Sequence, residues 1–191
     1  MMKWKRVLLL VIGVFIGIVI TQQFLGSELK TNNRKPAAEL TEDPTEVGPF
    51  IGALAPDFSL VGLDGKTYAL SDLKGDKPVL VNFWASWCPP CKAEAPDLVQ
   101  LYEEYGDQME IYAVNLTTSD TVKGAQEFVD DYGFEFPVLL DEKGEVGKVY
   151  QALSIPTSYF VDRNGIIQNK MIGITSPDKL EKMFQELINK K

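Results

Sequence analysis

Two cysteines, Cys88 and Cys91, are the residues of this 191-residue chain best suited to chemistry. They flank two prolines in the segment NFWASWCPPCKAEAP, residues 82–96. A structural zinc site needs four Cys or His ligands, and the chain has these two thiols and no histidine, so we expect no metal. A structural disulfide that closes so short a loop would contribute only about 2 kcal/mol. A redox-active pair is the interpretation that also explains the surrounding residues.

The residues around the pair predict a strand that ends and a helix that begins. Val79 to Trp84 is a nearly continuous apolar run, typical of a strand covered on both faces. A helical spacing of apolar residues then runs from Cys91 to Tyr105. Cys88 would cap this helix with an exposed sulfur. Backbone N–H groups and the positive end of the helix dipole stabilise a thiolate there. We therefore expect Cys88 to attack a substrate disulfide and Cys91 to resolve the mixed disulfide.

Pro89 and Pro90, between the two cysteines, should limit how strongly the thiolate is stabilised. Prolines are tolerated in the first helical turn because its N–H groups have no partner within the helix. They also remove two N–H donors, which leaves the N–H of Cys91 as the expected donor to the Cys88 sulfur. We predict a moderate lowering of the Cys88 pKa, which favours a reductant over a strong oxidant.

The rest of the folded part alternates strands and helices. A hairpin is expected around the turn Gly62–Gly65. Further strands are expected at 111–116, 137–141, 157–161 and 166–172, and further helices at 122–132, 146–153 and 177–188. This order predicts an α/β domain with a mixed sheet and helices on both faces.

The N-terminal residues predict a membrane anchor. Val7 to Ile20 is an unbroken apolar run, and the residues up to Leu25 extend it to about the length that crosses a bilayer. Lysines and an arginine precede the run, which places the N-terminus in the cytoplasm and exports the remainder of the chain. We expect an uncleaved anchor over 1–25, a polar tether over 26–49 and a folded domain over 50–191. A cleaved signal peptide is the alternative.

The net charge also differs between the N-terminal part and the remainder of the chain. Residues 1–35 hold six Lys or Arg and one Glu, a net charge of +5, and the whole chain carries −8, so the remainder carries −13. An acidic exported domain has no electrostatic basis for binding nucleic acid.

The motifs resemble those of thioredoxin-like proteins, in the membrane-anchored TlpA/ResA branch. The resemblance rests on the Cys-Pro-Pro-Cys segment with Trp84 and Trp87 before it, on Pro96 in the following helix, and on Ile155-Pro156-Thr157 before a later strand. It covers the chain from about Ala55 to the end. It implies a thioredoxin-like fold with an N-terminal β-hairpin, a central helix–strand insertion over about 119–141, and no cofactor.

The resemblance also implies roles for individual residues. Pro156 would be a cis-proline that packs on the disulfide and, with Ile155, shapes a substrate groove, to which Trp87, Pro89 and Pro90 would contribute. Plain thioredoxins carry a buried aspartate six residues before the first cysteine, where this chain has Asn82. Glu94 would replace it as the acceptor of the Cys91 proton. A solvated surface glutamate is the alternative for Glu94.

The function implied is a membrane-tethered thiol–disulfide oxidoreductase outside the cytoplasm. In the family such a reductase receives electrons from a membrane thiol–disulfide transporter and reduces exported proteins such as apocytochrome c before haem attachment. A related branch acts in spore envelope formation. Other candidates are a non-catalytic binding module, an oxidant or isomerase, and a peroxidase, although a peroxidase would carry threonine where this chain has Ala85.

Overall fold

The structure is a computed structural model that describes residues 46–190. The predicted membrane anchor over 1–25 and most of the predicted tether over 26–49 lie outside the described residues. Within residues 46–190, no helix is both long and apolar enough to cross a membrane.

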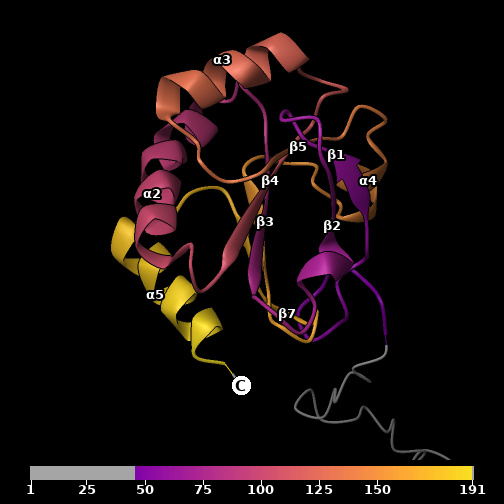
Figure 1. Ribbon diagram of the computed structural model, residues 1–191, viewed down its shortest axis with the longest axis vertical. Helices are drawn as coiled ribbons and strands as arrows, with labels where there is room; N and C mark the ends of the chain where they lie inside the picture. Colours follow the sequence, from indigo (N-terminus) through magenta and orange to yellow (C-terminus); the bar gives the residue numbers. More distant parts are fainter. Residues whose placement is uncertain (1–45, 191) are drawn as a thin grey trace, which may run out of the picture. The chain divides into compact units, whose positions relative to one another are not determined.

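A five-stranded mixed sheet forms the centre of the domain, in the order β5-β4-β3-β6-β7 (Figure 1). The middle strand β3 pairs in parallel with β4 and antiparallel with β6. The edge strand β5 runs parallel to β4, and β7 runs antiparallel to β6. The strands are β3 (Val79–Trp84), β4 (Glu110–Asn115), β5 (Val138–Leu140), β6 (Thr157–Val161) and β7 (Ile167–Ile172). Every residue of β3 is buried, as the apolar run predicts.

Helices cover both faces of this sheet, as predicted. On one face lie α2 (Pro89–Tyr105), α3 (Val122–Tyr132) and α5 (Pro177–Ile188) (Figure 1). On the other face lies α4 (Glu145–Val149). The same face carries the predicted hairpin of β1 (Ser59–Val61) and β2 (Thr67–Ala69), followed by the 3-10 helix η1 (Leu70–Leu73).

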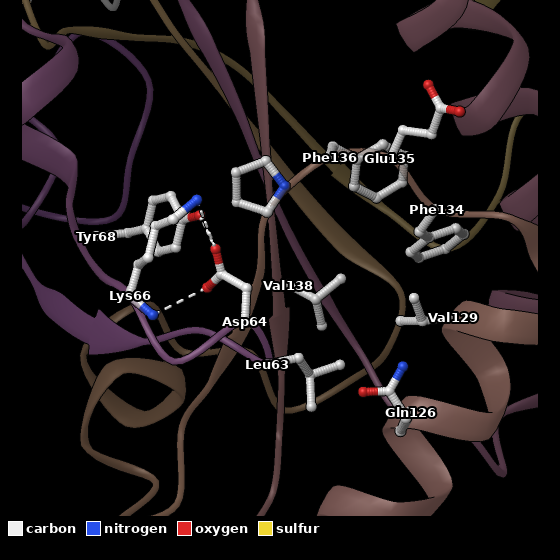
Figure 2. Close-up of a pocket in the computed structure, with 11 residues that line it drawn as sticks. Leu63, Asp64, Lys66, Tyr68, Gln126, Val129, Phe134, Glu135, Phe136 and Val138 are labelled. Atoms are coloured by element: carbon white, nitrogen blue, oxygen red, sulfur yellow. Dashed lines mark hydrogen bonds and ion pairs between the residues drawn. The ribbon is translucent and has the colours of Figure 1, made fainter.

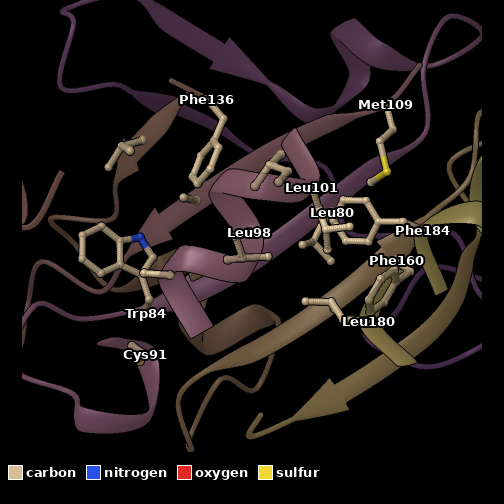
Figure 3. Packing of buried hydrophobic residues seen from close by; sticks show 14 of the residues in the cluster. Leu80, Trp84, Cys91, Leu98, Leu101, Met109, Phe136, Phe160, Leu180 and Phe184 are labelled. Atoms are coloured by element: carbon tan, nitrogen blue, oxygen red, sulfur yellow. The ribbon is translucent and has the colours of Figure 1, made fainter. Parts of the chain in front are cut away.

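Successive residues of β3 point to opposite faces and enter two different hydrophobic cores. Leu80 packs in the core shared with α2 and α5, where Leu98 and Phe184 lie (Figure 3). Val81 packs in the opposite core, with Tyr150 next to α4. Burying each large apolar side chain contributes about 1.5–3 kcal/mol, so both cores hold β3, and the residues after it, in place.

Most predicted element ends are confirmed, and the helix over 146–153 is the main correction. Helix α3 ends at Gly133, which has φ 72°. Helix α4 ends at Val149, and Leu153, which the predicted helix included, is 95% exposed. The cause is Gln151, whose φ of 53° breaks the helix, while the next N–H, of Ala152, donates back to Gly147 at 2.9 Å. This arrangement is a Schellman ending, formed here without glycine.

Candidate active site

The two cysteines form a disulfide at the junction of β3 and α2, as the sequence predicts. Cys88 is the N-cap of α2 and has extended backbone angles, while Pro89 is the first helical residue. The backbone N–H of Cys91 donates to Cys88 Sγ at 3.3 Å. This is the single donor that the prolines were expected to leave. Pro89 and Pro90 themselves lie exposed on the surface.

The sulfur of Cys88 is less accessible than expected. Cys88 is only 2% exposed, so the prediction of an exposed cap sulfur is wrong for the disulfide form. The reason is the chain segment before β6, where the carbonyl oxygen of Ile155 lies 3.6 Å from Cys88 Sγ. The Ile155–Pro156 peptide bond is cis, as predicted. After reduction, the Cys88 thiol could donate its hydrogen to the Ile155 carbonyl.

Glu94 lies inside the domain, one helical turn beyond Cys91. Its side chain is 4% exposed, which rules out the alternative of a solvated surface glutamate. Burial raises the pKa of Glu94 to about 7, a hydrogen bond from Asn82 opposes the shift, and the charge of Asp97 adds to it. A carboxyl group with this pKa can accept and release a proton near neutral pH. Its role as the acceptor of the Cys91 proton stays a prediction.

Asn82 connects Glu94 to the sheet. Its amide nitrogen donates to Glu94 Oε2 at 3.1 Å and to Ser158 Oγ at 2.9 Å. Ser158 is the direct neighbour of Asn82 across the β3–β6 pairing. Ser158 was missed by sequence reasoning, because only the strand register reveals that it faces Asn82.

Trp87, the tryptophan next to Cys88, is 55% exposed. Its indole N–H donates to the carbonyl oxygen of Ser119 at 2.7 Å, which fixes the orientation of the ring. An exposed aromatic face beside the disulfide suits the predicted contact with substrate.

The loop that carries Trp87 is fastened by Asp120, a second residue that sequence reasoning missed. The backbone N–H and the hydroxyl of Ser86 donate to the two Asp120 oxygens at 2.6 and 2.7 Å. The amide of Asn115 also donates to Asp120, at 2.8 Å. Partial burial raises the pKa of Asp120, but these hydrogen bonds outweigh burial and hold it below its usual value. No sequence motif marks this pairing, which joins residues 34 positions apart.

The larger surface hollows are not lined by the cysteines. One, of about 380 Å³, lies between the hairpin and the segment after α3 (Figure 2). Of its two carboxylates, Asp64 and Glu135, Asp64 already accepts a hydrogen bond from Tyr68 at 2.8 Å and pairs with Lys66 at 3.1 Å. Another, of about 580 Å³, lies between β1 and α4. The redox chemistry therefore belongs to the disulfide and the side chains around it.

Comparison with known proteins places the chain in a family. Residues 51–170 match the family model described as AhpC/TSA family. The chain belongs to the AhpC/TSA family. It is 42% identical over 142 residues to the thioredoxin-like protein YneN of Bacillus subtilis, covering 74% of this chain and 82% of YneN. It is 30% identical over 185 residues to the thiol-disulfide oxidoreductase ResA of Bacillus cereus, covering 96% of this chain and 95% of ResA.

A solved structure similar to this chain supports the same conclusion. A putative thiol:disulfide interchange protein DsbE from Chlorobium tepidum superimposes with a TM-score of 0.64 at 35% identity, covering 71% of this chain and 95% of that protein. The domain therefore has the thioredoxin-like fold. With the bonded Cys88–Cys91 pair at the start of α2, this ResA-like member of the family is a thiol–disulfide oxidoreductase.

Proposed function

We propose that this oxidoreductase is a membrane-tethered reductant of disulfides in exported proteins, with apocytochrome c as its foremost substrate. The hydrogen bonding of Cys88 carries the proposal. Within the part of the chain that the structure describes, its sulfur accepts one backbone N–H, from Cys91. Thiolates that are strongly stabilised make disulfides oxidising, whereas a moderately stabilised thiolate leaves the disulfide form favoured and the dithiol reducing.

The proposed electron donor is a membrane thiol–disulfide transporter. The apolar run at residues 7–20, preceded by basic residues, supports a tether to the same membrane, with the catalytic domain outside the cytoplasm. Tethering both proteins would raise their effective concentration, so a weak contact between them would suffice.

A trapping experiment with Cys91→Ser in the producing cells tests the proposal. Cys88 of this variant can attack a substrate disulfide, but no thiol remains to release the product. We expect a trapped apocytochrome with a CxxCH motif. Cys88→Ser is the matched control and should trap nothing. A trapped spore-envelope protein would instead support the alternative pathway, and no trapped partner would favour a binding module.

The reduction potential tests the direction of electron flow. Potentials of this protein class run from about −270 mV for thioredoxin to about −120 mV for strong oxidants. We expect a value below about −200 mV on that scale, measured by equilibration with glutathione or dithiothreitol. A value near the oxidising end would contradict a reductant.

A further inference from the structure

A small cavity lies beneath the disulfide, between α2 and the end of β3. Its volume is about 10 Å³, and Cys91, Glu94 and Trp84 line it together with the rings of Phe128 and Phe134. Cavities lined only by apolar groups stay dry, whereas one buried water needs roughly 10–15 Å³ and two to four polar partners. The size of this cavity is at the lower edge of that range, so its polar lining decides what it can hold.

Two polar atoms of that lining have no partner. Among the described residues, Trp84 Nε1 and Glu94 Oε1 are the buried side-chain nitrogen and oxygen atoms without a hydrogen bond. The indole N–H can only donate and a carboxylate oxygen accepts. Asn82 holds the other oxygen of Glu94 at 3.1 Å, which leaves Oε1 free. The nitrogen of the Trp84 ring is on the side that faces Leu98 of α2 (Figure 3).

One water molecule would satisfy both atoms at once. Its oxygen would accept from the indole N–H, and one of its hydrogens would donate to Glu94 Oε1. In the reduced protein, the second lone pair of its oxygen would accept from the thiol of Cys91, which also lines the cavity. Three hydrogen bonds are the usual number for a buried water.

We propose that Trp84 is a positioning residue in thiol–disulfide exchange, because its indole N–H anchors a single water that joins Cys91 to Glu94. The inference rests on the proposed function only in that it uses the reducing direction; the water site is independent of the substrate. In this role Trp84 acts through the water. It sets the hydrogen bonding of the group that takes the proton.

The water completes the second step of the reaction. In the first step, the Cys88 thiolate attacks a substrate disulfide, and one substrate sulfur leaves as a thiolate. The Cys91 thiol then passes its proton to the water, which passes another proton to the Glu94 carboxylate. The Cys91 sulfur attacks Cys88 Sγ, the bond from Cys88 to the substrate breaks, and the second substrate thiolate leaves. The substrate gains two electrons, which the cysteine pair loses, and Glu94 later returns its proton to solvent.

The indole N–H should lower the pKa of Glu94. A donor to the water oxygen polarises the water and strengthens its hydrogen bond to the ionised carboxylate. The other group that acts on Glu94 by its charge is Asp97, on the same helix. The packed elements contribute uncharged groups, namely Asn82 from β3, Phe128 from α3 and Phe134 from the segment after it. Removing the indole N–H should therefore be visible in the titration of Glu94.

Trp84→Phe in the full chain removes the N–H and keeps an aromatic ring. We expect the titration midpoint of Glu94, followed by carboxyl ¹³C NMR, to rise by about one pH unit. The rate of exchange with a small disulfide at pH 7 should fall several-fold, and the pH at which this rate is half-maximal should move with the midpoint. Phe136→Leu is the matched control, since Phe136 is buried in the same core, is not among the residues that line the cavity and carries no polar atom. It should lower stability without moving the midpoint.

The double variant Trp84→Phe/Glu94→Gln separates the proposal from a packing effect. In the Glu94→Gln background, removing the N–H should leave the pH profile unchanged. An unchanged Glu94 midpoint in folded Trp84→Phe would overturn the proposal. Failure of the trapping experiment alone would overturn the proposed substrate and leave this result standing, because the titration uses no protein substrate.

The unaltered protein supplies a second measurement if Trp84→Phe does not fold. The indole ¹H and ¹⁵N shifts of Trp84 should track the titration of Glu94 and lose that dependence in Glu94→Gln. The indole proton should also show cross-relaxation with a long-lived water. An indole signal that ignores the Glu94 titration and contacts no such water would refute the assignment.

Discussion

Replacing Glu94 with Gln should make the oxidised protein more stable at pH 8 while it slows catalysis. The carboxylate is 4% exposed, and its burial raises the pKa to about 7 from 4.5. The folded protein therefore holds this proton more tightly than the unfolded chain does. Stability from this group is fully present below pH 4.5 and is lost as the pH rises toward 7.

The pKa shift sets the size of the effect. A rise from 4.5 to about 7 corresponds to about 3 kcal/mol of unfolding free energy, since one pKa unit equals about 1.4 kcal/mol. The glutamine side chain of the variant would keep an oxygen to accept from Asn82 and would carry no charge to bury. We expect the variant to exceed the parent by up to about 3 kcal/mol at pH 8 and by little at pH 4.5.

Urea unfolding of the disulfide form at several pH values measures this difference. The chain has no histidine, and the bonded cysteines do not titrate, so few other groups change charge between pH 5 and 8. Glu110 also has a raised pKa because of burial, but it is present in both proteins and cancels in the comparison. Equal pH dependence of parent and variant would refute a buried Glu94 with a raised pKa. A stabilised variant with an unchanged exchange rate would refute its role as proton acceptor.

Two further substitutions test the support around the site. Asp120→Asn should slow disulfide exchange and cost about 2 kcal/mol of stability at pH 7, because Ser86 donates to both Asp120 oxygens and the amide nitrogen that replaces one of them cannot accept. The stability that depends on the lowered pKa of Asp120 is present above its usual value of 3.8 and is lost as the pH falls through the lower folded value. Acid unfolding with the same pH profile in the parent and the variant would contradict this role of Asp120. Gln151→Gly should raise the unfolding free energy by about 0.5–1 kcal/mol, because φ is 53° at this position and glycine adopts positive φ without strain. Thermal unfolding measures this increase in stability. Gln151→Ala is the control and should show no increase.

The sequence predicted the elements whose signals are local. The run Val79–Trp84 forms β3 with both faces covered, and Gly133 ends α3 in a left-handed conformation. The end of α4 could not be predicted because its left-handed residue is Gln151, which carries no such preference. The contact of Ser158 with Asn82 could not be predicted either, because it depends on the register between β3 and β6, which are far apart in the sequence. The chemistry of the cysteines could be predicted because the end of β3, the cap of α2 and the first turn of α2 follow one another directly in the sequence.

The amide at position 82 and the carboxyl at position 94 form a matched pair. Asn82 donates both of its hydrogens, to Glu94 Oε2 at 3.1 Å and to Ser158 Oγ at 2.9 Å. A carboxylate at position 82 would offer no hydrogen there when ionised. It would also place two acids in contact, so that one of them must stay protonated. An acid on α2 instead of β3 thus requires a neutral hydrogen-bond donor on β3, and Asn82 is that donor. Glu94 then remains the single titrating group beneath Cys91.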